Sequence, residues 1–564
     1  MKWHFVCLAV IVWMFVSPHK VEGSWVDVQD SSRIACKNRP QVPENGHSDV
    51  FARTQWQTVV GLYGVYHFGK RWRLVTRSRR TKKRPLEKSV PSRSASEPVQ
   101  NRLKPVAADT GNEPDTLDEE GERIPFRMVL RPGVLLTRHG IQLRPMIARL
   151  GKDASEYLAL WQDKDRFKAD IAHLLRRSCP LCEGESGFGC ISSDKRSVIP
   201  VGEKNRVWFR VQKIACQDCG RITRILPTFC IPYKSHHAQT IQNALENCWR
   251  RNNSYRDTTG IINQTRPADG QYQGHTLPYE WTIWLGGLAI HLPQFLVWLG
   301  LRLPRHGLLD EYFMEQDNDT DNHRIFAVTV QDPESTAIWN IVRVDRNDTE
   351  AFKQTLQHLR QVGIQLRAIT SDGWPAILRA VREELAGAIH LLCYFHAKKN
   401  VFETLEKYRR AKKCPKDAPE LSQLCRAFFD ILEAPDARRY RARLRKLTKQ
   451  VADEPILLAR CRSFQKKSHY NTLRLRSPLL AATTSLVELS FKFLTRKAES
   501  MYSFRKSRCN AAQKSLIVWA LVRDFVPYLP GAKYAGRSPA ELAGVDLDGL
   551  PWLQFINLKL SEGA

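Results

Sequence analysis

The sequence predicts an α/β fold for residues 305–530, and three observations lead to it. Three apolar, β-branched runs between residues 308 and 344 are separated by turn residues, which is the pattern of consecutive strands. Residues 349–394 then alternate between helical spacing and short buried strands. Residues 397–475 are basic and carry apolar residues at helical spacing. We therefore expect a sheet-based core into which an all-helical segment is inserted.

Each element of this core has its own signal. The strands are apolar and rich in β-branched residues. The helices place their apolar side chains on one face, as Phe352, Leu356 and Leu359 do. The resulting order, β-β-β-α-β-α-β, is that of a ribonuclease H-like core. The expected strands are residues 308–314, 324–330, 337–344, 366–370 and 390–394, and the expected helices are residues 349–361 and 374–385.

The charge balance indicates a polyanionic partner. Lys and Arg number 87 against 58 Asp and Glu, so the formal net charge is +29. Nucleic acid is the usual partner of such a surplus, because each neutralised phosphate releases condensed counterions. A basic tail that only aids solubility is the alternative. Residues 279–301 are apolar, but Gly286, Gly287 and Pro293 interrupt them too often for a membrane span, so we expect no membrane partner.

Residues 1–127 differ from the rest of the chain. Residues 1–24 combine an early lysine with an apolar run, which is the pattern of a signal peptide. Export would separate a nucleic-acid-binding protein from its partner. We therefore interpret this segment as an upstream extension, with Met128 as a plausible start and a cytoplasmic, nucleoid-associated protein. Residues 25–127 are basic, then rich in Pro and Ser, then acidic, a composition that predicts disorder.

Two Cys-x-x-Cys pairs, Cys179/Cys182 and Cys216/Cys219, predict a zinc ribbon over residues 179–219. Each pair forms a tight turn that directs two thiolates to one ion, and two such turns complete a tetrahedral Zn²⁺ site. Four thiolates leave no position for water, so this zinc is expected to be structural. The segment between the pairs has the alternation of a β-hairpin. Four buried free cysteines are the alternative reading.

Two acidic residues lie on or directly after predicted strands, where catalytic side chains are common. Asp310 lies on the first strand, and Asp372 follows the fourth strand, directly before Gly373. Open α/β sheets carry their chemistry at such strand ends. Converging carboxylates bind Mg²⁺ or Mn²⁺, and a pair of such ions can activate the attacking oxygen and stabilise the leaving oxygen in phosphodiester cleavage. Glu311, on the opposite face of the same strand, is the alternative to Asp310.

Three short motifs resemble those of bacterial insertion-sequence DDE transposases related to the Mutator-like and hAT groups. They are Asp372-Gly-Trp-Pro-Ala, His390-Leu-Leu-Cys-Tyr-Phe-His396 and Thr483-Thr-Ser-Leu-Val-Glu488. Cys393 and His396 match the Cys-x-x-His motif that follows the second Asp in that family, and the match implies that they support the active site. The family Glu often stands in Thr-Asn-x-x-Glu. Ser485 replaces the Asn here, and Glu499 is the alternative to Glu488.

The resemblance covers about residues 175–560 and implies a function. Asp310, Asp372 and Glu488 would form a DDE triad that holds Mg²⁺ or Mn²⁺ and cleaves transposon ends before strand transfer to target DNA. Two ends must be paired, so a homodimer or a larger assembly on DNA is expected. A catalytically inactive or domesticated transposase-derived DNA-binding protein is the alternative. A secreted zinc-dependent protein is a third reading, if the leader is functional.

Candidate DNA contacts lie in two places. The helices after the ribbon could form a helix-turn-helix, with Arg250, Arg251 and Arg256 on phosphates, although an ordinary helical linker would have the same pattern. Lys398 and Lys399 follow the Cys-x-x-His motif and are further candidates. The expected segments are an extension (1–127), a part with the ribbon (128–235), a helical part (236–304), the catalytic domain (305–530) with its insertion (397–475), and a tail (531–564).

Overall fold

The computed structural model describes residues 127–562, apart from 138–139, 204, 265–273, 275, 315–324, 478–479 and 499–508. The chain divides into two compact units, residues 1–109 and 110–564, and every described residue belongs to the second unit. The predictions made for residues 1–126 and for Glu499 therefore lie outside the described residues. Within the described part, no helix has both the length and the apolar character needed to cross a bilayer.

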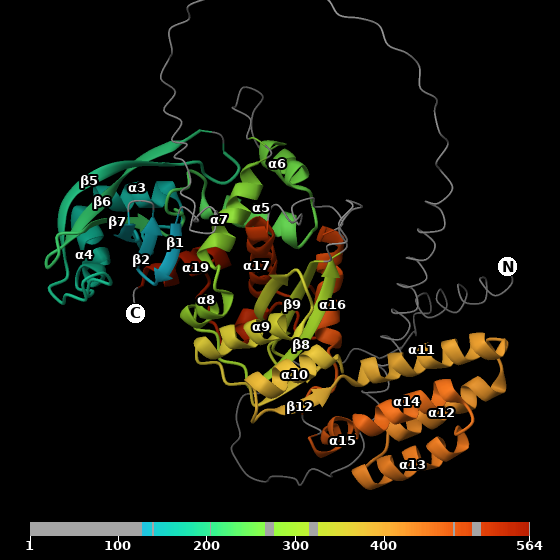
Figure 1. Ribbon diagram of the computed structural model, residues 1–564. Helices are drawn as coiled ribbons and strands as arrows, with labels where there is room; N and C mark the ends of the chain where they lie inside the picture. The colour runs from blue at the N-terminus through green and yellow to red at the C-terminus, as the bar shows by residue number, and fades with distance from the viewer. Residues whose placement is uncertain are drawn as a thin grey trace, which may run out of the picture. The chain divides into compact units, whose positions relative to one another are not determined.

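A mixed five-stranded sheet forms the centre of the described chain (Figure 1). Its strands are β8 (His306–Met314), β9 (Ile325–Gln331), β10 (Ile338–Val344), β11 (Ala368–Ser371) and β12 (Ile389–Leu392). They lie in the order β10-β9-β8-β11-β12. The first three strands pair antiparallel, whereas β11 runs parallel to both β8 and β12. The predicted α/β class is thereby confirmed.

Two helices connect the later strands in the predicted order. α9 (Thr349–Gln361) begins where the Asp348 carboxylate accepts the Ala351 N–H at 3.0 Å, which is an ordinary N-cap. α10 (Pro375–Glu384) begins with a proline, a residue whose missing N–H costs nothing in the first turn. Both helices bury their apolar stripes, so their periodicity was sufficient to predict them.

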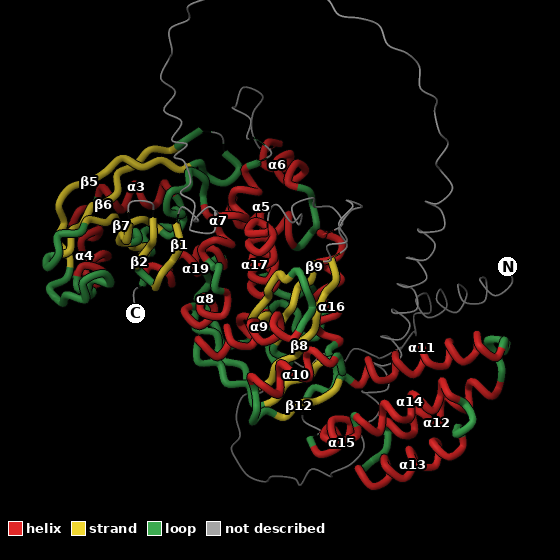
Figure 2. The backbone as a smooth tube through the Cα atoms, in the orientation of Figure 1, coloured by secondary structure: helices red, strands yellow, loops and turns green. Residues whose placement is uncertain are grey.

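Five further helices follow β12; the first four pack around a core of their own, and the fifth packs mainly against β12 (Figure 2). They are α11 (Tyr394–Lys412), α12 (Pro419–Leu432), α13 (Ala437–Gln450), α14 (Pro455–Lys466) and α15 (Ser468–Arg476). Their shared core includes Val401, Leu405, Phe428, Leu432, Leu444, Leu457 and Phe464. This core is separate from the core of the central sheet. The helices therefore form a separate helical insertion, which follows β12 in the sequence and precedes the next helix.

Two long helices then return to the sheet. α16 (Ser485–Ala498) packs against β8, where Phe491 lies 5.2 Å from the Tyr312 ring. α17 (Cys509–Phe525) runs along β10. Since β10 is the last strand of the sheet on that side, its outward-facing backbone groups need partners.

Side chains of α17 supply those partners. The Arg343 N–H donates to Gln513 Oε1 at 2.7 Å, and Gln513 Nε2 donates to the Ile341 carbonyl at 2.9 Å. Further along α17, both carboxylate oxygens of Asp524 accept the Ile338 N–H, at 3.1 and 2.9 Å. The helix therefore satisfies both ends of the edge strand, which would otherwise be open to pairing with another chain.

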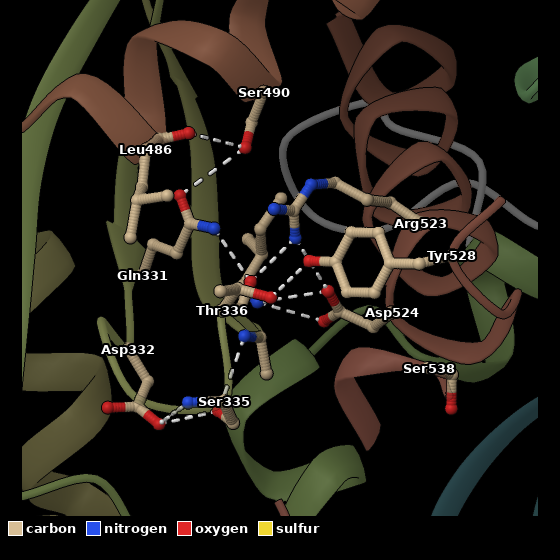
Figure 3. Close-up of polar contacts among 12 residues, drawn as sticks. Gln331, Asp332, Ser335, Thr336, Leu486, Ser490, Arg523, Asp524, Tyr528 and Ser538 are labelled. Carbon is tan, nitrogen blue, oxygen red and sulfur yellow. Dashed lines mark hydrogen bonds and ion pairs between the residues drawn. The ribbon is translucent and has the colours of Figure 1, made fainter. Parts of the chain in front are cut away.

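The turn between β9 and β10 is held by the same two helices (Figure 3). Gln331 Nε2 and Arg523 Nη1 both donate to the Thr336 carbonyl, each at 2.6 Å. Ser490 of α16 donates to Gln331 Oε1 at 3.4 Å. Thr336 has a φ of 65°, a left-handed conformation that is costly for a β-branched residue. These hydrogen bonds fix the turn in spite of that cost.

Replacing Asp524 with alanine should lower the free energy of unfolding by about 3 kcal/mol, because a buried N–H and the Arg523 guanidinium would lose their acceptor. The Asp524 side chain is fully buried, and burial raises its pKa to about 7 although Arg523 and the Ile338 N–H act in the opposite direction. Chemical denaturation measures the loss. The exposed Asp453 is the control, and its alanine variant should change stability by less than about 0.5 kcal/mol. Equal losses in both variants would contradict this role.

The N-terminal described part contains two smaller sheets. β1 (Arg127–Arg131), β2 (Val134–Thr137) and β3 (Gly140–Leu143) form one antiparallel sheet. The other has the order β4-β7-β6-β5, and α3 and α4 pack against it. The bounds of its elements are β4 (Met146–Ala148), β5 (Phe188–Val198), β6 (Val207–Cys216), β7 (Ile222–Pro227), α3 (Ala154–Gln162) and α4 (Lys164–Leu175).

Helices join this part to the central sheet. α5 (Ala238–Trp249) and α7 (Leu277–Leu288) pack against α17, and α6 (Tyr255–Gln264) packs on both of them. The C-terminal helix α19 (Trp552–Ser561) lies against α5 and β4, where Trp552 Nε1 donates to Glu246 Oε1 at 2.9 Å. The two remaining helices are α8 (Leu292–Trp298) and α18 (Pro539–Leu542).

Candidate active site and metal centre

Asp310 and Asp372 are neighbours because of the strand register. β8 and β11 are parallel, and Leu309 lies beside Ser371 at the end of their paired segment. Asp310 is the next residue of β8, and Asp372 directly follows the end of β11, so the register places the two acids next to each other along the sheet. Asp310 is only 5% exposed, and its Oδ1 accepts the N–H of Glu311 at 2.9 Å. Oδ1 of Asp372 accepts the Trp374 N–H at 2.9 Å.

Glu488 reaches the same place from the first turn of α16. The contact between Phe491 and Tyr312 fixes α16 on the face of β8 that carries Asp310, since Tyr312 and Asp310 are two residues apart on one strand. The ligand atoms of Asp310, Glu488 and His396 all lie within 4.8 Å of one another. Three segments that are far apart in sequence therefore converge on one point.

The segment before α16 is docked onto the sheet by its backbone. Thr370 Oγ1 of β11 donates to the Ala481 carbonyl at 2.6 Å, and the Tyr394 N–H donates to the Ala482 carbonyl at 2.8 Å. These bonds set where α16 begins. They explain how a glutamate so far along the chain returns to the strand ends after the five inserted helices.

The electrostatics of the cluster favour a bound cation. Burial raises the pKa of Asp310 well above its usual range, and the charges of Glu488 and Asp372 raise it further. Burial also raises the pKa of Glu488. Burial lowers the pKa of His396 to about 4, so its ring is neutral at physiological pH and can offer a nitrogen lone pair. The carboxylates supply the oxygen ligands that Mg²⁺ or Mn²⁺ prefers, and the neutral imidazole adds one nitrogen to the set.

Thr484 connects the supporting residues to Glu488. Its backbone N–H and its Oγ1 each lie 3.3 Å from Cys393 Sγ. The same Oγ1 lies 3.5 Å from His396 Nδ1 and 3.5 Å from Glu488 Oε1. His396 Nε2 is 3.6 Å from that glutamate oxygen. Cys393 and His396, predicted to support the site, are thus linked to the third acid through one buried hydroxyl that the sequence reasoning did not single out.

Replacing Thr484 with valine should reduce metal-dependent DNA cleavage about tenfold, because Glu488 and His396 would lose the hydroxyl that orients them. The isosteric change keeps the side-chain volume. Thr495, about three turns further along the chain in α16, donates its hydroxyl to the Phe491 carbonyl at 2.8 Å and gives the matched control. Cleavage rates of both variants at saturating Mg²⁺ and at limiting Mg²⁺ would be compared. An unchanged rate and metal requirement for the Thr484 variant would exclude this positioning role.

Two lysines also lie near the acids. Lys467 Nζ donates to the Gly373 carbonyl at 2.7 Å. Burial lowers the pKa of Lys467, whereas Asp372 raises it. The charge of Lys399 lowers the pKa of Glu488. Sequence reasoning missed Lys467, because its only signal was membership of the basic inserted segment.

Lys398 was predicted as a phosphate contact, and its position does not suit that role. It is 6% exposed, and its Nζ donates to Glu433 Oε1 at 2.6 Å. The ammonium also lies 4.6 Å from the Tyr394 ring centroid and 4.5 Å from that of Phe429. These contacts hold the side chain within the inserted helices, so we remove it from the candidate DNA contacts.

The other predicted DNA contacts lie around the turn between α5 and α6. Arg251 and Arg256 are exposed. Arg250 is partly buried and donates to the Pro527 carbonyl at 2.7 Å, which ties α5 to the end of α17. Arg251 and Arg256 therefore remain available to phosphates, and Arg250 has a structural contact of its own.

The four predicted zinc ligands come together at the end of the β5–β6 hairpin. The sulfurs of Cys179, Cys182, Cys216 and Cys219 all lie within 4.8 Å of one another. Cys182 Sγ is 3.7 Å from Cys216 Sγ, and Cys179 Sγ is 4.0 Å from Cys219 Sγ. A tetrahedron with Zn–S bonds of about 2.3 Å has edges of about 3.8 Å, so the thiolates fit Zn²⁺. The four thiols are not joined in disulfides.

The two cysteine turns have the same local geometry. Each ends with a residue in the left-handed region directly after its second cysteine, Glu183 with φ 60° and Gly220 with φ 68°. Asp218 of the second turn joins the two, because its Oδ1 accepts the Ser186 hydroxyl at 2.6 Å and its Oδ2 accepts the Ser186 N–H at 3.2 Å. This repeated turn positions the four sulfurs for one ion.

One family model matches part of the chain. Residues 179–263 match a family model described as a domain of unknown function (DUF6431). Among curated proteins, none matches the sequence. The matched region begins at the first zinc-ligand candidate and ends within α6. It therefore covers the cysteine cluster and the helices that carry Arg251 and Arg256.

Two similar solved structures come from retroviruses. A chain of the simian T-cell lymphotropic virus intasome, solved in complex with a PP2A regulatory subunit, is 15% identical and matches 24% of this chain and 50% of its own, with a TM-score of 0.14. The match thus spans half of that viral chain. The HTLV-2 integrase catalytic core domain, solved with magnesium in a trimeric form, is 17% identical and matches 23% of this chain and 86% of its own, also with a TM-score of 0.14. At such TM-scores these likenesses carry no inference about function.

Proposed function

We propose that this chain is a DDE-type transposase that cuts DNA at transposon ends and joins them to target DNA. The observation that supports the proposal is the cluster of Asp310, Glu488 and His396, whose ligand atoms lie within 4.8 Å of one another, with the charge of Asp372 acting on Asp310. One acid lies within β8, one directly follows the parallel strand beside it, and one lies in the first turn of α16. Their order along the chain and the β-β-β-α-β-α-β order of the sheet are those expected of a ribonuclease H-like catalytic core.

The roles of the residues follow from their positions. Asp310 presents its carboxylate to Glu488 of α16 and His396 of α11, and we propose that Asp372, which directly follows the strand beside Asp310, supplies the third carboxylate. When bound there, Mg²⁺ or Mn²⁺ would supply the charge that activates an attacking oxygen and stabilises a leaving oxygen on phosphorus. Thr484 and Cys393 hold Glu488 and His396 in place. Lys399 and Lys467, beside the acids, would balance charge on a phosphate.

The remaining parts have proposed roles in holding DNA. Zn²⁺ on the four cysteines would stabilise the ribbon, and Arg251 and Arg256 in the helical part would contact phosphates. The inserted helices carry an exposed basic surface on α13 that suits a DNA backbone. Because two ends must be joined together, we propose that the protein acts as a homodimer or larger assembly on DNA, beside the nucleoid. We also propose that the chain is divided at the segment boundaries predicted from the sequence.

The proposal is tested by cleavage of the DNA that flanks the gene. The purified chain would be incubated with plasmid carrying those flanks, and with plasmid in which the terminal repeats are scrambled. We expect cutting at the repeat boundary in Mg²⁺ or Mn²⁺ and none on the scrambled plasmid. Tight binding to the repeats without cutting in either metal would instead support the alternative, a transposase-derived protein that only binds DNA.

A further inference from the structure

The β5–β6 hairpin exposes an aromatic side chain that the zinc site does not use. In Figure 1 these two strands form a long curved ribbon. On its inner face, Phe209 packs against Tyr157 of α3, with ring centroids 5.2 Å apart. On its outer face Trp208 is 60% exposed. The indole therefore presents a large part of its aromatic surface to solvent on this face, where it is accessible to a planar ligand.

The surroundings of Trp208 are polar and basic. Residues directly opposite in an antiparallel pair share one face, and Trp208 lies opposite Ser197. Two residues further along β6, on the same face, Arg210 lies opposite Lys195. Arg206, which directly precedes β6, is also exposed. The outer face therefore presents one large ring with cations on either side of it along the strand.

The pairing of Lys195 with Arg210 is unfavourable by itself. Like charges directly opposite in an antiparallel pair repel, with Cβ atoms about 5 Å apart, and Arg210 Nη1 donates to the neutral Ser193 hydroxyl at 3.0 Å. Among the described residues, no carboxylate lies within ion-pair distance of either cation; Asp194, their neighbour, binds Lys213 at 3.6 Å and Arg224 at 2.6 Å. An anion placed between the two cations would relieve the repulsion. The face is thus complementary to a polyanion and not to a second copy of itself, which would bring the same charges together.

We propose that this outer face binds single-stranded DNA, with a base stacked on Trp208 and the adjoining phosphates on Lys195, Arg210 and Arg206. Unpaired bases offer their faces for stacking, whereas the bases of a duplex are already stacked on each other. Cations flanking an aromatic ring along one strand match a backbone that carries a phosphate on each side of a base. The choice of DNA over RNA rests on the proposed function; the binding surface itself does not.

Binding of labelled oligonucleotides by the full chain tests this proposal. Fluorescence anisotropy would be measured with a mixed-sequence single strand and with the duplex of the same sequence, without added Mg²⁺ or Mn²⁺. Trp208→Ala should weaken single-strand binding about five- to a hundredfold, the range seen when one stacking aromatic is removed. Trp208→Phe keeps a ring and should retain most of the affinity. The combined Lys195→Ser and Arg210→Ser variant should reduce the slope of log K against log salt concentration, where K is the association constant, by about 1.4 in magnitude.

The control removes two cations elsewhere in the same part of the chain. Arg166 and Lys168 are exposed on α4, a helix that also carries Asp165 and Asp170, and their double serine variant should leave the salt dependence unchanged. Parent-like single-strand binding by Trp208→Ala would overturn the proposal, as would a loss confined to the duplex. Because binding is measured without cleavage, an inactive parent would leave this result intact.

Discussion

Asparagine in place of Asp310 is expected to abolish cleavage and, at the same time, to stabilise the metal-free protein. Loss of one carboxylate from the cluster should slow cleavage at least about a hundredfold, the scale on which single preorganised charged or polar groups act in active sites. The free energy of unfolding should rise at neutral pH, since burial beside Glu488 and Asp372 makes the ionised Asp310 unfavourable. The asparagine oxygen can still accept the Glu311 N–H.

The difference in stability between the parent and Asp310→Asn should change with pH in one direction. The pKa of Asp310 is raised in the folded protein, so the unfolded chain releases that proton first as pH rises. The parent therefore loses stability relative to Asp310→Asn as pH rises above the usual range of an aspartate. Mg²⁺ should restore stability to the parent and not to the variant. Denaturation at two pH values, with and without Mg²⁺, measures both effects; a destabilised Asp310→Asn would indicate that the acid is structural.

Loss of zinc is expected to unfold the ribbon. The apparent binding free energy of structural Zn²⁺ in small cysteine sites is about 10–16 kcal/mol, which is larger than the stability of most domains. Cys216→Ser should therefore lose one equivalent of zinc per chain. Because the second cysteine turn sits at the end of β6, the β5–β6 hairpin should also lose protection from amide exchange.

The control for that variant lies on the same hairpin. Cys190 of β5 is exposed and is not one of the four clustered cysteines. Cys190→Ser should keep its zinc and the exchange protection of the hairpin. Zinc content by mass spectrometry of the intact chain distinguishes the two variants. One equivalent of zinc retained by Cys216→Ser would contradict the four-thiolate site.

Much of the central sheet could be predicted because its strands are short, apolar and bounded by turn residues. The run at 308–314 lies in β8 and the run at 337–344 begins one residue before β10, since buried strands need little beyond apolar β-branched residues to be recognised. Asp310 and Asp372 could be proposed from the same pattern. Once the strands are placed, parallel pairing of β8 and β11 brings these two positions together.

The remaining features depend on contacts that a one-dimensional pattern does not contain. Nothing in the sequence around Thr484 indicates that its hydroxyl would face Cys393, His396 and Glu488, because those residues meet only after five inserted helices. A lysine in a basic helix is usually solvated, so burial of Lys398 against Glu433 was not expected. Likewise, the role of α17 at the β10 edge follows from tertiary packing and not from helical periodicity.

The most direct test of the account compares Asp372→Asn with the parent. Both proteins would be assayed on DNA carrying the terminal repeats in Mg²⁺, alongside Asp417→Asn, an exposed aspartate between α11 and α12. The account predicts cutting at the repeat boundary by the parent and the Asp417 variant, and none by Asp372→Asn, with all three binding the repeats alike. Cutting by Asp372→Asn at the parent's rate would contradict the claim that the three converging acids carry the reaction.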